Sequence, residues 1–392
     1  MVTGKKKKGW WYGIGGTVAV VAIVLFFGRE PRHEPRAPAP GMLPRATPQT
    51  TGNPPPITAR ANRGSPVTAP SKPNVGPEVC GFGTAPPQMA DPTSLGSYVE
   101  DLTAKTTERW RAALLDSSDP RARAVGLLIR RFKLHSHGEG ADEADATPAE
   151  ELRDELVQLA VGGSDPAVYL AATWLCDTGL KDASTTGSCQ RVSLAGWSRI
   201  DPDNLMPWLA LARDARNRGD LAGEAAAFAQ AAHAHRSDLY DDAMLQAALT
   251  EMPRDAKPLE EAAFAIDVVG YQGAMPRLQL GEALRYCSGE SLQQDDKRRQ
   301  CNAVAEVLVK EGKTLFDLSV GAKLGAQLGW PPQRVAQLKQ ELETVLHLPN
   351  PDADPWSCRN VALTNKITEG RAKSGEVRFW RDHMVVTRTD TR

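Results

Sequence analysis

Two apolar segments, YLAATWL (169–175) and MPWLALA (206–212), carry the main information about the fold of this chain. Each segment contains one tryptophan, and Trp174 and Trp208 lie 34 residues apart. Between them, IDPDN (200–204) combines the proline and small polar residues that end one helix and cap the next. A period of 34 residues is typical of paired-helix repeats, in which each helical hairpin buries its apolar face by stacking on a neighbour. The spacing therefore predicts stacked helical hairpins.

Residues 205–238 resemble one unit of the tetratricopeptide-repeat family. The resemblance depends on apolar and small residues at the family's spacing, among them Trp208, Leu211 and Phe228. It implies that four large side chains form the core of the repeats: Trp174, Trp208, Leu211 and Phe228. Glu224 departs from the pattern, because the family has an alanine at this place. A generic stack of helix pairs without the family's contacts is the alternative.

The resemblance also implies a concave groove that accepts an extended or helical segment of a partner protein. Met206, Leu209, Arg213 and Arg216 occupy the first-helix positions that face such a groove. These four residues lack the lysine and asparagine with which some family members grip a chain-terminal carboxylate. We therefore expect the groove to bind a protein segment by other contacts.

Helical spacing of apolar residues continues on both sides of this unit, and no convincing pair of strands occurs between residues 91 and 348. The pattern predicts an all-α domain of helical hairpins over 80–348. After Pro349 the large side chains are separated by polar and glycine-containing runs. We expect an irregular extension over 349–392, with a short hairpin near Gly375 as the alternative.

The N-terminal region differs in composition from the rest. A basic tail (1–8) precedes an uncharged apolar segment (9–28), which is long enough to cross a hydrocarbon core of about 30 Å as a helix. The lysines beside this segment predict a cytoplasmic N-terminus. A cleaved signal peptide is the alternative, but Arg29-Glu30-Pro31 follows directly and supplies no cleavage site of small residues. Residues 29–79 are rich in proline, which predicts a disordered and extended linker.

Charge is distributed unevenly along the chain. Residues 1–79 have five Lys and six Arg against three Glu, so their net charge of +8 leaves −9 for the remainder of a chain whose total is −1. An acidic folded region lacks the basic face that nucleic-acid binding requires, and we expect no nucleic-acid partner. The basic linker suits contact with anionic cell-wall polymer, and a solvated spacer is the alternative.

The six cysteines all follow the apolar segment, as expected for disulfides in an oxidising compartment, although six reduced and buried thiols are the alternative. Cys176 and Cys189 are 13 residues apart and Cys287 and Cys301 are 14 apart, which suits a clip across a helical hairpin. The remaining pair, Cys80 with Cys358, would connect the start of the folded region to its end. Six cysteines allow 15 pairings, so this pairing is a prediction from spacing alone.

No group of residues predicts catalysis, and we expect no cofactor and no metal. The pair Glu290-Ser291 resembles the glutamate and serine of all-helical lytic transglycosylases, which cleave cell-wall glycan. The downstream Gly-Leu-Met-Gln stretch of that family is absent. The polar neighbours of Glu290 also provide no apolar pocket that would raise the pKa of its carboxyl group.

These features predict a single-pass protein of a bacterial inner membrane, with its main domain in the periplasm. The expected function is a tetratricopeptide-like scaffold that binds a protein partner in envelope assembly, secretion or translocation. Two alternatives remain: a cell-wall-active enzyme of the lytic-transglycosylase type, and a structural spacer between membrane and cell wall.

Overall fold

The computed structural model describes residues 76–89, 91–136, 149–177, 187–275, 277–346 and 354–389. The predictions of a basic tail (1–8), of a membrane anchor (9–28) and of most of the linker (29–79) concern residues outside this part of the chain. The predicted end of the linker at residue 79 is wrong, because Glu78 and Val79 form a strand that pairs with Gly83–Thr84 and Val79 is buried. Among the helices that are described, none is both long and apolar enough to cross a membrane.

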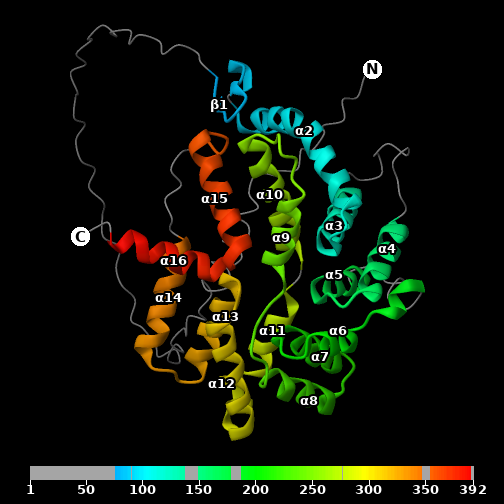
Figure 1. Ribbon diagram of the computed structural model, residues 1–392. Coiled ribbons are helices and arrows are strands. Elements are labelled where there is room, and N and C mark those ends of the chain that lie inside the picture. Colours follow the sequence, from blue (N-terminus) through cyan, green and yellow to red (C-terminus); the bar gives the residue numbers. More distant parts are fainter. Residues whose placement is uncertain are drawn as a thin grey trace, which may run out of the picture.

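The described chain is mainly helical, as the apolar spacing predicts, and begins with one short β-hairpin (Figure 1). Strands β1 (Glu78–Val79) and β2 (Gly83–Thr84) pair antiparallel around a tight turn. Three 3-10 helices are short: η1 (Pro87–Met89), η3 (Gly187–Arg191) and η4 (Gly289–Gln293). The α-helices are α2 (Pro92–Asp116), α3 (Pro120–Ser136), α4 (Ala149–Gly162), α5 (Pro166–Asp177), α6 (Leu194–Ile200), α7 (Leu205–Asn217), α8 (Leu221–Ala231), α9 (Asp241–Thr250), α10 (Pro258–Ala274), α11 (Leu278–Tyr286), α12 (Asp295–Lys310), α13 (Leu315–Gln327), α14 (Pro332–Leu346), α15 (Cys358–Ser374) and α16 (Glu376–Thr389).

Short polar residues begin the helices of the central hairpin, α7–α8. The side chain of Asn204 accepts a hydrogen bond from the backbone N–H of Met206, which fixes the start of α7 as the IDPDN segment predicts. Gly219 then turns the chain with a positive φ of 77°, and Asp220 caps α8 through the backbone N–H of Gly223 at 2.8 Å. These local signals give the hairpin its boundaries.

The two tryptophans do not occupy equivalent places, so the prediction of a 34-residue repeat is wrong for this pair. Helix α5, which carries Trp174, packs mainly on α4 and less on α6. Trp174 is therefore on the second helix of its hairpin, whereas Trp208 is on the first helix of α7–α8. The physical reason is that the short α6 and the intervening η3 separate α5 from the next long helix instead of forming a second full-length partner.

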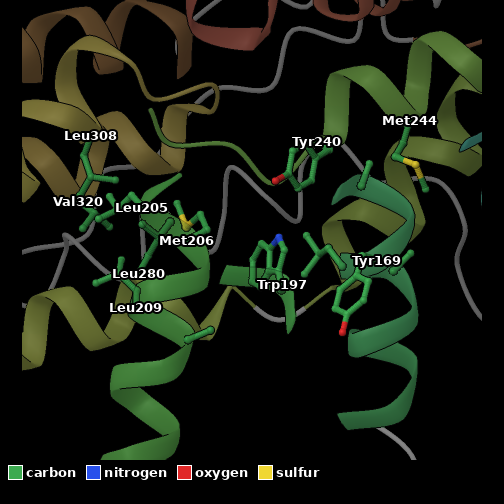
Figure 2. Packing of buried hydrophobic residues seen from close by; sticks show 14 of the residues in the cluster. Tyr169, Trp197, Leu205, Met206, Leu209, Tyr240, Met244, Leu280, Leu308 and Val320 are labelled. Atoms are coloured by element: carbon green, nitrogen blue, oxygen red, sulfur yellow. The ribbon is translucent and has the colours of Figure 1, made fainter. Parts of the chain in front are cut away.

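Helices α9, α10 and α11 run through the middle of the molecule, with α3–α8 on one side and α13–α16 on the other (Figure 1). A large apolar core connects these three groups of helices. Phe228 is fully buried in it, whereas Trp174, Trp208 and Leu211 are partly buried and pack against it. Trp110 is also fully buried, stacks on Phe264 at 4.6 Å between ring centroids and donates its indole N–H to the backbone oxygen of Ala248 at 3.1 Å. Part of this core is shown in Figure 2.

The C-terminal region is helical, so the prediction of an irregular extension over 349–392 is wrong for residues 358–389. Helix α15 packs on α9 and α10, and α16 follows it after Gly375. The ring of Phe379 lies over Gly370, where an added Cβ would stand within 2.1 Å of it. Helix α15 is polar in sequence and is stabilised by packing, with Val361 buried against its neighbours and Leu363 exposed.

All three predicted disulfides are present, and the described residues contain no free cysteine. Cys176–Cys189 and Cys287–Cys301 are local clips with a Cα–Cα distance of 5.7 Å each. Cys80–Cys358 connects the β-hairpin to the start of α15. Three disulfides are in keeping with an oxidising compartment.

Candidate functional site

Helix α7 has two apolar faces on opposite sides, and each has a different environment. At about 100° per residue, Met206, Leu209, Arg213 and Arg216 form one face, while Trp208 and Leu211 lie on the other. The structure covers the first face and leaves part of the second open. The sequence assigned the opposite roles to these two faces.

The face predicted to line an open groove is occupied by α11. Met206 and Leu209 are fully buried, and Leu209 lies beside Leu280 of α11 (Figure 2). Leu280 and Ala283 of α11 are likewise fully buried. Because a helix of the same chain fills this concave surface, the prediction that Met206 and Leu209 contact a partner is wrong.

Ion pairs hold α11 in the groove at its polar edge. The guanidinium of Arg216 donates from Nε to Oε2 of Glu282 at 3.1 Å, and the side chain of Glu282 is only 1 % exposed. Burial raises the pKa of the Glu282 carboxyl group, while hydrogen bonding to Arg216 and the nearby charge of Arg213 oppose the rise. The two predicted groove arginines thus face a carboxylate of the same chain.

Glu224 forms the matching contact from α8. Its carboxylate pairs with Arg285 of α11, and its side chain is 7 % exposed. Beside this pair, the rings of Phe228 and Tyr286 stack with their centroids 3.9 Å apart. The glutamate that departs from the repeat pattern therefore has a role in this chain, because it fixes α11 across the hairpin.

The opposite face of the hairpin forms a shallow recess of about 310 Å³. Trp208 and Leu211 of α7 border it, and both are only partly buried. The indole N–H of Trp208 donates to the backbone oxygen of Pro202 at 2.7 Å, which fixes the orientation of the ring. The other lining residues are mostly small or lie at the ends: Ala215, Arg218, Asp220, Gly223, Ala226, Ala227 and Gln230.

This end of the hairpin differs from the end of the other long hairpin, α12–α13. There α14 packs on α13 and buries Leu338 and Leu342 of its own apolar face. Helix α8 packs mainly on α7 and more lightly on α12. The α7–α8 hairpin thus has an uncovered end face of the type on which a further helix stacks in helical-repeat proteins.

The composition of α8 is the one feature of the sequence that relates to this end face. Helix α8 reads LAGEAAAFAQA, and its small residues are spread around the helix instead of forming a single narrow stripe. A helix that is apolar all round is normally covered on all sides. Periodicity alone could not show that one side of α8 has no cover.

The resemblance to lytic transglycosylases gains no support in the fold. Glu290 and Ser291 fall in η4, between Cys287 and Cys301. In the described ranges, no three His, Cys, Asp or Glu side chains gather as a metal site. Comparison with known protein families, curated proteins and solved structures gives no match to this chain.

Proposed function

We propose that this chain is a membrane-anchored scaffold of helical hairpins, tetratricopeptide-like in α7–α8, which binds a protein partner outside the cytoplasm. The observation that carries this proposal is the uncovered recess between Trp208 and Leu211 of α7 and the small residues of α8. Side chains as small as Ala226 and Ala227 allow a partner helix to approach the backbone closely, so that its larger apolar side chains fill the recess.

The position of the recess suits this role. The described chain begins at Gly76 beside β1, at the end of the molecule opposite to α7–α8 (Figure 1). An extended linker over 29–75 that rises about 3.1 Å per residue would separate the domain from the anchor at 9–28 by on the order of 100–150 Å. The recess would then lie well clear of the membrane, within reach of partners in the periplasm or on the outer side of the envelope.

Ala226→Arg tests the proposal. Ala226 is exposed, so the arginine should fold without strain and block the recess. Ala225→Arg is the matched control, because Ala225 is the exposed neighbour that does not line the recess. We expect a photo-crosslinker at Ala226 in whole cells to trap one dominant protein, and the same crosslinker at Ala225 to trap it weakly or not at all.

The trapped protein is then purified and titrated with the full-length chain in detergent. We expect Ala226→Arg to weaken the affinity by at least about tenfold, which corresponds to about 1.4 kcal/mol of binding free energy. Ala225→Arg should not weaken it. Equal affinities of both variants, or equal crosslinking from both positions, would refute binding at this recess.

A further inference from the structure

The turn between α15 and α16 docks against the starts of two other helices, α9 and α13. Gly375 in this turn has a φ of 85°, and an added Cβ would stand 3.0 Å from Oδ2 of Asp242 in the first turn of α9. The turn therefore lies directly on the Asp242 carboxyl group. We name residues 371–377 the latch.

Backbone hydrogen bonds connect the latch to α13. The N–H of Val377 donates to the backbone oxygen of Lys313 at 3.2 Å. In return, the N–H of Leu315 donates to Oε2 of Glu376 at 2.9 Å. The other end of α15 is fixed covalently by Cys358 in its bond to Cys80. The latch is thus the end of this helix that can open without breaking a covalent bond.

The junction contains more acidic than basic groups. Its five carboxyl groups are those of Asp238, Asp241, Asp242, Asp317 and Glu376. The basic groups that face them are Arg277, Lys313 and Arg371. The ion pair between Asp201 and Arg236 and the buried hydroxyl of Tyr271 complete the surroundings. If every group were ionised, two negative charges would remain without a balancing cation in a poorly hydrated place.

Four of the five carboxyl groups have direct partners. Asp238 accepts a hydrogen bond from the backbone N–H of Tyr240 at 2.6 Å and lies 3.8 Å from a guanidinium nitrogen of Arg236. Asp241 forms an ion pair with Arg277, and Oδ2 of Asp317 accepts hydrogen bonds from two backbone N–H groups at 3.0 and 3.1 Å. Glu376 accepts the bond from α13 and lies 3.7 Å from a guanidinium nitrogen of Arg371. Oδ1 of Asp242 and Oδ1 of Asp317 are both buried and have no hydrogen-bond partner among the described residues, but the other oxygen of Asp317 accepts two backbone hydrogen bonds. Asp242 is therefore the carboxyl group whose ionised form has the least stabilisation from direct partners.

Burial and neighbouring charge favour the protonated forms. Burial, with Asp241 as the second cause, raises the pKa of Asp242 to about 7. Burial raises the pKa of Asp238 and of Asp317 to about 6. Between about pH 4 and pH 7 the folded protein thus binds protons that the unfolded chain releases. Stability at this junction falls as the pH rises through that window.

We propose that the latch is a proton-controlled contact. It packs against the starts of α9 and α13 when the excess carboxyl groups of the junction are protonated, and it separates from them when these groups ionise. Release would free the start of α16 while the disulfide keeps α15 attached to the β-hairpin. This inference is independent of partner binding at the α7–α8 recess.

Hydrogen exchange of the full-length chain in detergent tests the proposal. After correction for the intrinsic rate, we expect the amides of residues 376–383 to exchange roughly tenfold or more faster at pH 8 than at pH 5.5, since one pKa unit is tenfold in an equilibrium. Amides in α7, far from the latch, should show no such ratio. A carbon-13 titration of the Asp242 carboxyl group should have its midpoint near 7.

Asp242→Asn removes the charge and keeps the shape of the side chain. In this variant we expect exchange in α16 at pH 8 to slow towards the rate at pH 5.5, because Asp238 and Asp317 still ionise in this range. Asp295→Asn, at an exposed first-turn aspartate of α12, is the matched control and should behave as the natural chain. The proposal is overturned if the natural chain shows equal corrected exchange at both pH values, or if Asp242→Asn keeps the full pH dependence. Asp238→Asn provides a second variant, which should shift the dependence in the same direction.

Discussion

At the scale of single residues, Glu224 shows how one position changes the use of a helical hairpin. A tetratricopeptide unit has an alanine here, which allows its two helices to pack closely. In this chain the carboxylate of Glu224 instead reaches Arg285 on α11, and Arg285 also contacts Glu282. A charged side chain that is 7 % exposed is tolerated because it has an ionic partner.

Glu224→Ala would match the family pattern, but we expect it to destabilise this protein. Arg285 loses one of its two carboxylate partners, and the loss should be about 1 kcal/mol because its side chain is 42 % exposed and stays hydrated. A double-mutant cycle with Arg285→Ala, followed by urea unfolding, measures the coupling. Asp214→Ala, which breaks the exposed pair with Arg218, is the control and should change the unfolding free energy by less. A stabilising effect of Glu224→Ala would show that the pair with Arg285 does not stabilise the fold.

At the scale of elements, α11 determines what the α7–α8 hairpin can bind. The helix has only nine residues, which is too short to be stable by itself in water. Its buried face on α7 and the clip from Cys287 to Cys301 at its end hold it in place. The concave surface is thus part of the core, and the proposed partner site is the end face of the hairpin.

Replacing both Cys287 and Cys301 by alanine should lower the unfolding free energy by about 3 kcal/mol, as the chain-entropy model gives for a loop of this size. Hydrogen exchange in α11 should become faster at the same time. The matched control is the double alanine variant of Cys176 and Cys189, whose loop is nearly as long. It should lose similar stability and leave α11 protected. If both variants affect α11 equally, the clip has no local role.

At the scale of the whole molecule, the chain is closed on itself. Cys80–Cys358 joins residues 278 positions apart, so the C-terminal helices complete the domain that the β-hairpin begins. Helix α15 packs on the central α9 and α10, and the small cluster under the disulfide includes Val79, Leu259 and Val361. The molecule is therefore more compact than an open stack of repeats.

Removing this long-range disulfide should cost more stability than removing a local clip. Replacing Cys80 and Cys358 by alanine is expected to lower the unfolding free energy by about 5 kcal/mol, against about 3 kcal/mol for the Cys176–Cys189 pair, because the closed loop is longer. Denaturant unfolding of the variants under identical conditions gives the comparison. An equal or smaller loss for the long-range pair would mean that the length of the closed loop does not set the effect, because the unfolded chain already keeps its two ends close.

The sequence alone determined those features that depend on neighbouring residues. The helical class, the start of α7 at Asn204 and the turn at Gly219 follow from apolar spacing and capping chemistry, which act within one or two turns. The pairing of the cysteines also followed from spacing, since 13 or 14 residues suit a local clip and only one pair then remains. Apart from Cys80–Cys358, which was paired by elimination, each of these inferences uses interactions over a short stretch of chain.

Only the tertiary structure decided which surfaces are covered. Helix α7 is apolar on two faces, so periodicity could not show that α11 would bury Leu209 and leave part of Trp208 open. It also could not show that α5 pairs with α4, which removes the equivalence of Trp174 and Trp208. The physical reason is that burial depends on which distant segment arrives at a face. That choice is made by packing and charge across the whole chain, as the pairing of Glu224 with Arg285 illustrates.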